Sequence, residues 1–285
     1  TEDKDPQFTL SLDKAAVNAV TVNFAVTGSA SPGGVDFTAP GQQAIAEGQT
    51  SKTFTVDVND DIISEQDETI ILTINSVQNA ELGSTISQSY TIKDNDGTPN
   101  VQFQNATQSI AENASPLPSV SVVLSKASSQ TITVPINLNF TGAGAGFASS
   151  SDTALSAATV VLAPGELTKS VSYTLANDAL VEGSETFTMT LSSPTNATLG
   201  STTTTTITIT DDEPVPTLNF SSGTSSGGEN VTPVNLTVTL SAASTLAITV
   251  KVNSADLSAS SGADYTAISN QTITFSPGEI SKTVS

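Results

Sequence analysis

The sequence of 285 residues contains no cysteine, no histidine and no tryptophan. Without cysteine the chain has no disulfide, no thiolate metal ligand and no thiol nucleophile. Without histidine it lacks the commonest general base, so Ser-His-Asp and Cys-His catalysis are excluded. Hydrolysis by paired carboxylates is the one catalytic alternative left open, but the sequence marks no cleft for it. We therefore expect that the chain is not an enzyme.

Basic residues are also scarce. Lys and Arg together number 8, against 28 Asp and Glu, which gives a formal net charge of −20. Such a charge disfavours nucleic acid and anionic membrane surfaces as partners. No stretch approaches the roughly 20 apolar residues that span a bilayer, so we expect no membrane insertion of this segment. The N-terminus also lacks the pattern of a signal peptide. Cations are the natural partners of this chain.

An internal repeat with a shift of 117 residues organises the sequence. NDDIISEQDETIILTI (59–74) aligns without a gap with ANDALVEGSETFTMTL (176–191), and DND (94–96) aligns with DDE (211–213). A third copy shows in the likeness of 109–127 to 227–243. We predict three units of a longer tandem array. They are residues 1–97, which lack the first strand, residues 98–214, which are complete, and residues 215–285, which are truncated at the C-terminus.

Apolar residues alternate with Thr and Ser throughout the chain, the period of half-buried strands. In the second repeat this pattern predicts strands at 100–111, 119–125, 131–140, 158–163, 168–176, 186–193 and 203–210. The pattern indicates an all-β fold of tandem immunoglobulin-like antiparallel β-sandwiches, each with about seven strands. Pro135 predicts an edge position or a bulge in the third of these strands, because proline has no N–H to donate to a ladder.

Acidic residues follow alternate strands: the first, third, fifth and seventh of each repeat. When consecutive strands alternate in direction, these ends all lie at one pole of the sandwich. In the first repeat the predicted polar set is Glu2, Asp36, Asp60, Asp61, Glu65, Glu68, Asp94 and Asp96. In the second repeat it is Glu112, Asp152, Asp178, Glu182, Glu185, Asp211, Asp212 and Glu213, and in the third it is Glu229 and Asp264. Asp67 aligns with Ser184 and is interpreted as surface charge.

So many carboxylates at one pole require counterions, since two like charges about 4 Å apart repel by roughly 1–4 kcal/mol. Calcium takes 6–8 oxygen ligands in loose geometry, so it suits carboxylates from several loops. Magnesium prefers stricter geometry, and zinc would normally bring His or Cys. The ligands are too dispersed for an EF-hand. Solvated acidic loops without metal are the alternative, but the recurrence at matching strand ends favours a calcium site.

These motifs resemble those of the Calx-beta domain family, over essentially the whole chain. The similarity is carried by GVDF (34–37), GADY (262–265), NDDIISEQDE (59–68) and DND (94–96). The resemblance implies calcium-binding β-sandwiches whose ligands are the Glu after the first strand, the Asp of the G-x-D-[YF] stretch, the Asp pair with its following Glu, and the closing acidic cluster. The second repeat departs from this pattern at Asn177 and around Asp152, where the usual Gly and aromatic residue are missing, so it would hold fewer or weaker ions.

The last strand of one repeat leads directly into the next repeat, so the acidic pole is also the junction. We therefore expect a non-catalytic array stiffened by Ca²⁺ at its junctions, in a large extracellular adhesin, surface-layer or filament protein on a bacterial cell surface. Its expected partners are calcium ions, neighbouring repeats of the same chain, and other copies in a filament or surface layer. The alternative is a regulatory calcium-sensor module, as in sodium–calcium exchangers.

Overall fold

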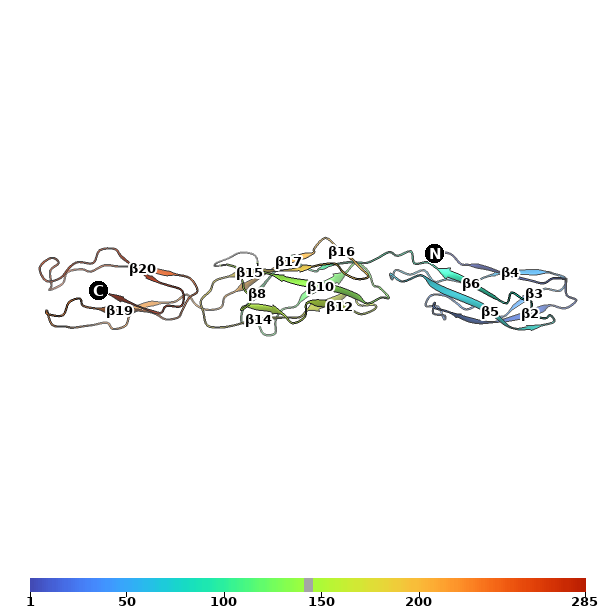
Figure 1. The fold of residues 1–285 in the computed structure, drawn as a ribbon, viewed down its shortest axis with the longest axis horizontal. Helices are drawn as coiled ribbons and strands as arrows, with labels where there is room; N and C mark the ends of the chain where they lie inside the picture. Colours follow the sequence, from blue (N-terminus) through green and yellow to red (C-terminus); the bar gives the residue numbers. More distant parts are fainter. Residues whose placement is uncertain (141–145) are drawn as a thin grey trace.

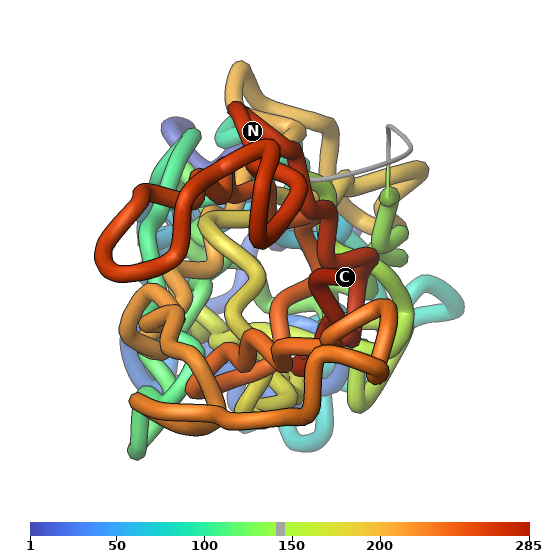
Figure 2. The backbone as a smooth tube through the Cα atoms, turned by 90° about the vertical axis from the view of Figure 1, so that its left-hand side faces the viewer, coloured from blue at the N-terminus to red at the C-terminus, as the bar shows by residue number. Residues whose placement is uncertain are grey.

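A computed structural model of the chain describes residues 1–140 and 146–285. Three β-sandwich units lie end to end along one axis (Figure 1), and a view along that axis projects them onto one another (Figure 2). Every regular element in the described ranges is a strand, so they contain no helix that could cross a membrane. The all-β fold class predicted from the sequence is confirmed.

The first repeat packs a two-stranded sheet against a four-stranded sheet of order β3-β2-β5-β6. Its core forms between the two layers, where Phe8 and Phe54 stack with ring centroids 5.8 Å apart above the buried Ile70 and Leu72. The strands are β1 (Gln7–Ser11), β2 (Val20–Gly28), β3 (Gln43–Ile45), β4 (Ser51–Thr55), β5 (Glu68–Gln78) and β6 (Ser87–Ile92).

The second repeat has sheets of order β12-β10-β15-β17-β8 and β13-β9-β7-β16, with the short pair β11-β14 at one side. One continuous core lies between the sheets and includes Val101, Phe103, Val134 and Ile207, all at 0% exposure. The strands are β7 (Asn100–Phe103), β8 (Thr107–Ala111), β9 (Val120–Leu124), β10 (Ile132–Asn139), β11 (Thr153–Leu155), β12 (Thr159–Leu162), β13 (Thr168–Val171), β14 (Tyr173–Leu175), β15 (Glu185–Leu191), β16 (Thr198–Leu199) and β17 (Thr204–Thr210).

The third repeat contains a three-stranded sheet of order β18-β19-β22 and the pair β20-β21. Val238, Phe275 and Val284 are buried between them. The strands are β18 (Leu218–Phe220), β19 (Leu236–Leu240), β20 (Ile248–Val252), β21 (Gln271–Phe275) and β22 (Ser281–Val284).

Two strand predictions for the second repeat need correction. The single strand predicted at 100–111 is two strands, because the chain crosses from one sheet to the other between them. β7 pairs antiparallel with β9, whereas β8 pairs in parallel with β17. The strand predicted at 168–176 is likewise divided into β13 and β14, which pair with β9 and β11. The sandwich is thus largely antiparallel, with two parallel pairs.

Pro135 does not lie in an edge strand, because β10 has β12 on one side and β15 on the other. A bulge does occur beside it. The Pro135 carbonyl accepts a hydrogen bond from Ser192 N–H, and the Thr133 carbonyl accepts one from Thr195 N–H. The partner segment therefore advances three residues while β10 advances two, which places the additional residue opposite the proline rather than in its own strand.

Candidate metal centre

The first repeat gathers six carboxylates into two groups of three at one pole. One group is Glu2, Asp94 and Asp96, and the other is Asp36, Glu65 and Glu68. Within each group, one oxygen per residue lies within 4.8 Å of the others. These residues come from four separate segments of the sequence, so only the folded sandwich brings them together.

The second repeat has the same two groups at its own pole. Glu112, Asp211 and Glu213 correspond to the first group, with the same limit of 4.8 Å between ligand oxygens. The second group is Asp152, Glu182 and Glu185. Both repeats therefore place acids from matching strand ends in the same two groups.

Local hydrogen bonds hold several of these carboxylates in place. Asp152 accepts a hydrogen bond from Ser149 N–H at 2.5 Å, and Asp36 accepts one from Ser31 N–H in the same kind of tight loop. Asp211 accepts hydrogen bonds from the N–H groups of Glu182 and Gly183 at 3.3 and 3.2 Å. The loop that supplies Glu182 is thereby tied to the closing acidic cluster.

Burial and mutual repulsion raise the pKa values of the glutamates in these groups. Burial, followed by the charges of Asp94 and Glu65, raises the pKa of Glu2 to about 7. Burial and a hydrogen bond with Asp36 raise the pKa of Glu68 to about 7. In the second repeat, burial and the charge of Glu185 raise the pKa of Glu182 to about 7. Glutamates with pKa values this high hold protons that a cation would displace.

Burial also raises the pKa of the remaining glutamates of these groups. Repulsion by neighbouring carboxylates adds to the effect for each of them: Glu65, Glu112, Glu185 and Glu213.

Among the residues that the structure describes, four buried carboxylate oxygens at these poles have no hydrogen-bond partner. They are Oε2 of Glu2, Oδ2 of Asp96, Oδ1 of Asp211 and Oε2 of Glu213. Unsatisfied buried acceptors are unfavourable unless a donor or a cation meets them. The donor set is all oxygen and all carboxylate, which fits Ca²⁺ and offers none of the nitrogen or sulfur ligands that zinc prefers.

The other predicted site residues lie outside the four groups. Asp61 and Asp178 bind their own loops, since their Oδ1 atoms accept hydrogen bonds from Ile63 and Leu180 N–H at 2.6 and 2.7 Å. Both still lie near the poles, because the charge of Asp61 raises the pKa of Glu2 and the charge of Asp178 raises that of Glu112.

Asp60 and Asp212 accept hydrogen bonds from asparagine side chains, Asn95 at 3.0 Å and Asn113 at 2.6 Å. In the third repeat, Asp264 caps its loop by accepting a hydrogen bond from Ser260 N–H at 2.8 Å. Glu229 and Asp264 line one cavity but belong to no group of three among the described residues.

The acidic poles of the first two repeats adjoin the next repeat, and in both a loop residue makes backbone hydrogen bonds across the junction that the sequence did not predict. At the first junction, Ser64 N–H donates to the Ala127 carbonyl, and Ser129 N–H donates to the Ser64 carbonyl, both at 3.0 Å. The Ser128 hydroxyl also donates to the Ser64 carbonyl at 3.0 Å. Lys126 of the second repeat completes the contact with a salt bridge of 3.2 Å to Asp96.

The second junction repeats this geometry with different side chains. Val181 N–H donates to the Ala243 carbonyl at 3.1 Å, and Thr245 N–H donates to the Val181 carbonyl at 3.0 Å. The Ser244 hydroxyl donates to the same carbonyl at 2.8 Å. Ala242 takes the place of Lys126, so this junction lacks the salt bridge. The recurrence of a buried serine at 128 and 244 is the sequence signal that marks the contact.

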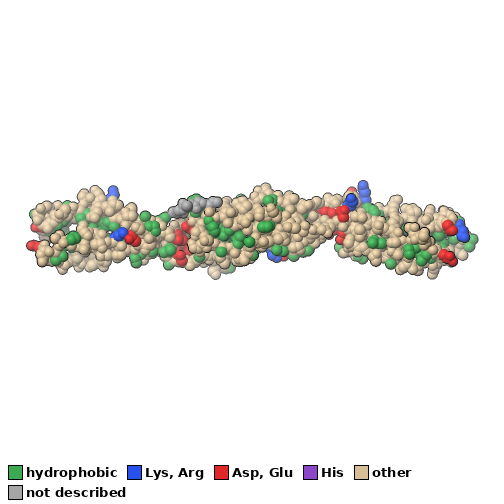
Figure 3. Space-filling view, viewed as in Figure 1, with side chains coloured by type: hydrophobic (Ala, Val, Ile, Leu, Met, Phe, Trp, Pro, Cys, Tyr) green, Lys and Arg blue, Asp and Glu red, His purple; other side chains and the backbone are tan. Residues whose placement is uncertain are grey.

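Acidic side chains are visible at both junctions in the space-filling view (Figure 3). The fold and these poles define a tandem array of β-sandwiches with carboxylate clusters of the kind that hold divalent cations. The Calx-beta domain family matches the chain over residues 2–96, 94–213 and 211–285. The chain therefore belongs to the Calx-beta family and consists of calcium-binding-type domains in tandem.

Solved structures of related domains have low overall similarity to this chain. CBD12 from CALX1.2 is 15% identical, with 73% of this chain and 94% of that chain covered and a TM-score of 0.33. The apo-form Calx CBD1 domain is 20% identical, with 41% of this chain and 100% of that chain covered and a TM-score of 0.34. No curated protein matches the chain.

Proposed function

We propose that the chain is a non-catalytic array in which Ca²⁺ binds the acidic poles and fixes each repeat against the next. One observation carries this proposal: the loop residue that hydrogen-bonds to the next repeat directly precedes a glutamate of a carboxylate group. Ser64 directly precedes Glu65, and Val181 directly precedes Glu182. Because one short loop supplies both groups, a cation that orders the glutamate also orders the backbone that hydrogen-bonds to the next repeat.

The metal would be held in the first repeat by the groups around Glu2 and Asp36, and in the second by those around Glu112 and Asp152. When bound, it supplies positive charge that neutralises the poles. The protein's own contribution is to position the carboxylates from separate strand ends and to keep part of each cluster away from water. Without cations, repulsion within each pole acts against the compact junction.

An extracellular location on a bacterial surface, in an adhesin, surface layer or filament, is supported by composition. The chain has no cysteine and few basic residues, and its strands are rich in Thr and Ser. Millimolar calcium outside the cell fills even sites with dissociation constants of about 10⁻⁴–10⁻³ M. In such a setting the array would act as a spacer that stays extended while calcium is present.

Small-angle scattering of the chain in calcium and in chelator tests this proposal, with magnesium as the control ion. We expect a longer maximum dimension and a higher melting temperature in calcium than in chelator, with little effect of magnesium. Scattering profiles and melting temperatures that do not change with calcium would contradict it. A submicromolar dissociation constant would instead favour a regulatory sensor.

A further inference from the structure

A buried serine on the far side of each junction hydrogen-bonds to the preceding repeat. Ser128 and Ser244 are 3% and 5% exposed, although serine is usually a surface residue. Each lies in a loop that we call the receiving loop, residues 126–130 in the second repeat and 242–246 in the third. The two hydroxyls donate to the carbonyls of Ser64 and Val181, at 3.0 and 2.8 Å. The partner that satisfies each buried hydroxyl therefore belongs to another repeat.

The hydrogen bonds of the first junction hold the Ser64 carbonyl in one direction. This carbonyl accepts from Ser128 Oγ and also from Ser129 N–H, each at 3.0 Å, so both of its lone pairs are used. Ser128 Oγ in turn accepts a hydrogen bond from Gln130 N–H at 3.1 Å, which fixes the hydroxyl on its own loop. The hydroxyl thus links the backbone of one repeat to the backbone of the next.

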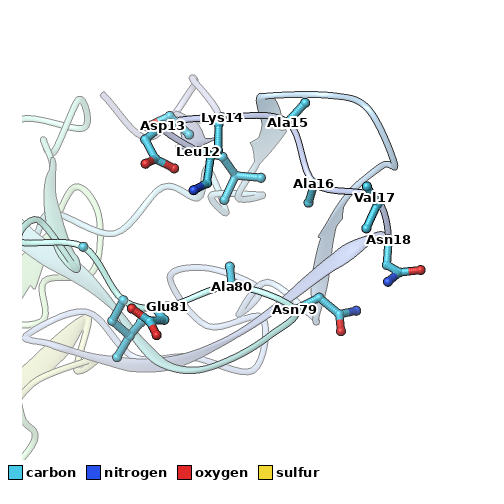
Figure 4. A pocket seen from close by; sticks show the side chains of 13 residues that line it. Leu12, Asp13, Lys14, Ala15, Ala16, Val17, Asn18, Asn79, Ala80 and Glu81 are labelled. Carbon is cyan, nitrogen blue, oxygen red and sulfur yellow. The ribbon is translucent and has the colours of Figure 1, made fainter.

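The receiving loop does not need this hydroxyl in order to fold. In the first repeat Ala16 occupies the equivalent position, in the loop shown in Figure 4. The Ala16 carbonyl accepts a hydrogen bond from Gly48 N–H at 3.0 Å, as the Ser128 carbonyl accepts one from Gly165 N–H at 2.9 Å. Because alanine supports the same backbone contact, the contribution specific to the serine hydroxyl is the hydrogen bond to the preceding repeat.

The side chain on the other side of the junction does not select the partner. Ser64 and Val181 differ in size and polarity, yet both dock through their backbone N–H and carbonyl groups. Serine is the side chain that hydrogen-bonds across both junctions, whereas the salt bridge of Lys126 occurs at the first. The receiving serine is therefore the side chain common to the two contacts.

The carbonyl that each serine holds is directly connected to a glutamate of the metal site. The Ser64 carbonyl and the Glu65 N–H belong to one planar peptide unit, and the same is true of Val181 and Glu182. A rotation of this unit changes the direction of the carbonyl and the position of the glutamate together. A cation that holds the glutamate therefore restricts the carbonyl that the serine binds.

We propose that Ser128 and Ser244 are the positioning residues that set the angle between successive repeats. Each hydroxyl holds the peptide unit that precedes a metal-site glutamate, and so couples a cation at that pole to the orientation of the next repeat. The coupling to calcium rests on the proposed function, whereas the hydrogen bond across the junction does not.

Single-molecule energy transfer between dyes at Val17→Cys and Val161→Cys tests the first junction in the full chain. We expect Ser128→Ala to lower the ratio of docked to undocked molecules in calcium by about two- to tenfold, the effect of one net hydrogen bond, and so to broaden the distribution of transfer efficiencies. Ser129→Ala is the matched control, because Ser129 is exposed and alanine keeps the N–H that it contributes. Equal distributions for the two variants would overturn the proposal.

The second junction provides an independent repetition of this test. Ser244→Ala should broaden the distribution between dyes at Val161→Cys and Leu257→Cys and leave the first junction unchanged. A wild-type distribution that is the same in calcium and in chelator would contradict the proposed function alone. The role of the serines is then decided by the comparison of Ser128→Ala with Ser129→Ala in the same buffer.

Amide hydrogen exchange separates a role at the junction from a role within the receiving loop. In Ser128→Ala the N–H groups of Ser64 and Ser129 should exchange faster, because both donate across the junction. Gly165 N–H donates to the Ser128 carbonyl within the second repeat and should keep its protection. Loss of protection at Gly165 would show that the serine shapes its own loop, and would overturn the assignment.

Discussion

Glu65 and Asp67 lie two residues apart in the same loop but have different surroundings. Glu65 is partly buried with Asp36 and Glu68, whereas Asp67 is exposed and belongs to no carboxylate group in the described residues. We expect Glu65→Gln to weaken calcium binding at the first pole by about tenfold or more, because the lost attraction to a divalent ion exceeds the roughly 1.4 kcal/mol that tenfold represents.

Asp67→Asn is the matched control, since it removes the same charge from an exposed position of the same loop. Isothermal titration calorimetry of both variants compares their dissociation constants for calcium. Equal dissociation constants for Glu65→Gln and Asp67→Asn would mean that Glu65 is not a ligand.

For individual residues, the sequence predicted which acids lie at one pole but not how they are distributed between the two groups of three. The alternation of strand direction placed Glu2, Asp36, Glu65 and Asp94 at one pole, and the structure brings them there. It could not separate the acids of the groups from Asp61, whose side chain binds the N–H of Ile63, because this turn depends on local backbone conformation. The division of each pole into two groups also depends on side-chain directions that the period-two pattern does not contain.

The elements of the fold were largely predictable, and the exceptions have identifiable causes. Alternation of buried residues predicts β10, β15 and β17 well because each has one face on the core. It fails between β7 and β8, because the chain changes sheets and the buried positions shift from Val101 and Phe103 to Ile110. The junction contacts were missed because they use backbone groups of Ser64 and Val181, which carry little sequence signal.

The two junctions differ in the loop that precedes β10 at the first and β20 at the second. This difference predicts that the two junctions allow different ranges of orientation when calcium is absent. Lys126 neutralises Asp96 at the first junction, with side chains 28% and 14% exposed. The second junction has Ala242 instead, and Oε2 of Glu213 has no hydrogen-bond partner among the described residues. A hydrogen bond to a charged group stabilises by roughly 1.5–3 kcal/mol. We expect the first junction to keep a narrower range of orientations in chelator than the second.

Because the chain has no cysteine, dye pairs can be placed at introduced cysteines without interference. Exposed Val17, Val161 and Leu257 provide one position in each repeat for single-molecule energy transfer. In chelator, Lys126→Ala should broaden the distribution of transfer efficiencies across the first junction. Ala242→Lys should narrow the distribution of transfer efficiencies across the second junction. If Lys126→Ala leaves the distribution of transfer efficiencies across the first junction unchanged, the salt bridge does not hold that junction.

For the whole molecule, the raised pKa values predict how stability without metal depends on pH. Glu2, Glu68 and Glu182 have folded-state pKa values of about 7, raised from 4.5 chiefly by burial. Below pH 4.5 these groups are protonated in both the folded and unfolded states, so they impose no penalty. As pH rises through 7 the folded protein must ionise buried, crowded carboxylates, and the stability present at low pH is lost.

The melting temperature in chelator should therefore fall between about pH 5 and pH 8, and calcium should remove this fall, because the bound ion favours the ionised carboxylates. Thermal unfolding followed by circular dichroism at both pH values, in chelator and in calcium, measures the effect. Glu2→Gln combined with Glu182→Gln is the internal control: it removes two of the titrating groups and should flatten the pH dependence in chelator. A wild-type melting temperature that rises from pH 5 to pH 8 in chelator would show that repulsion at the poles does not limit the stability of the array.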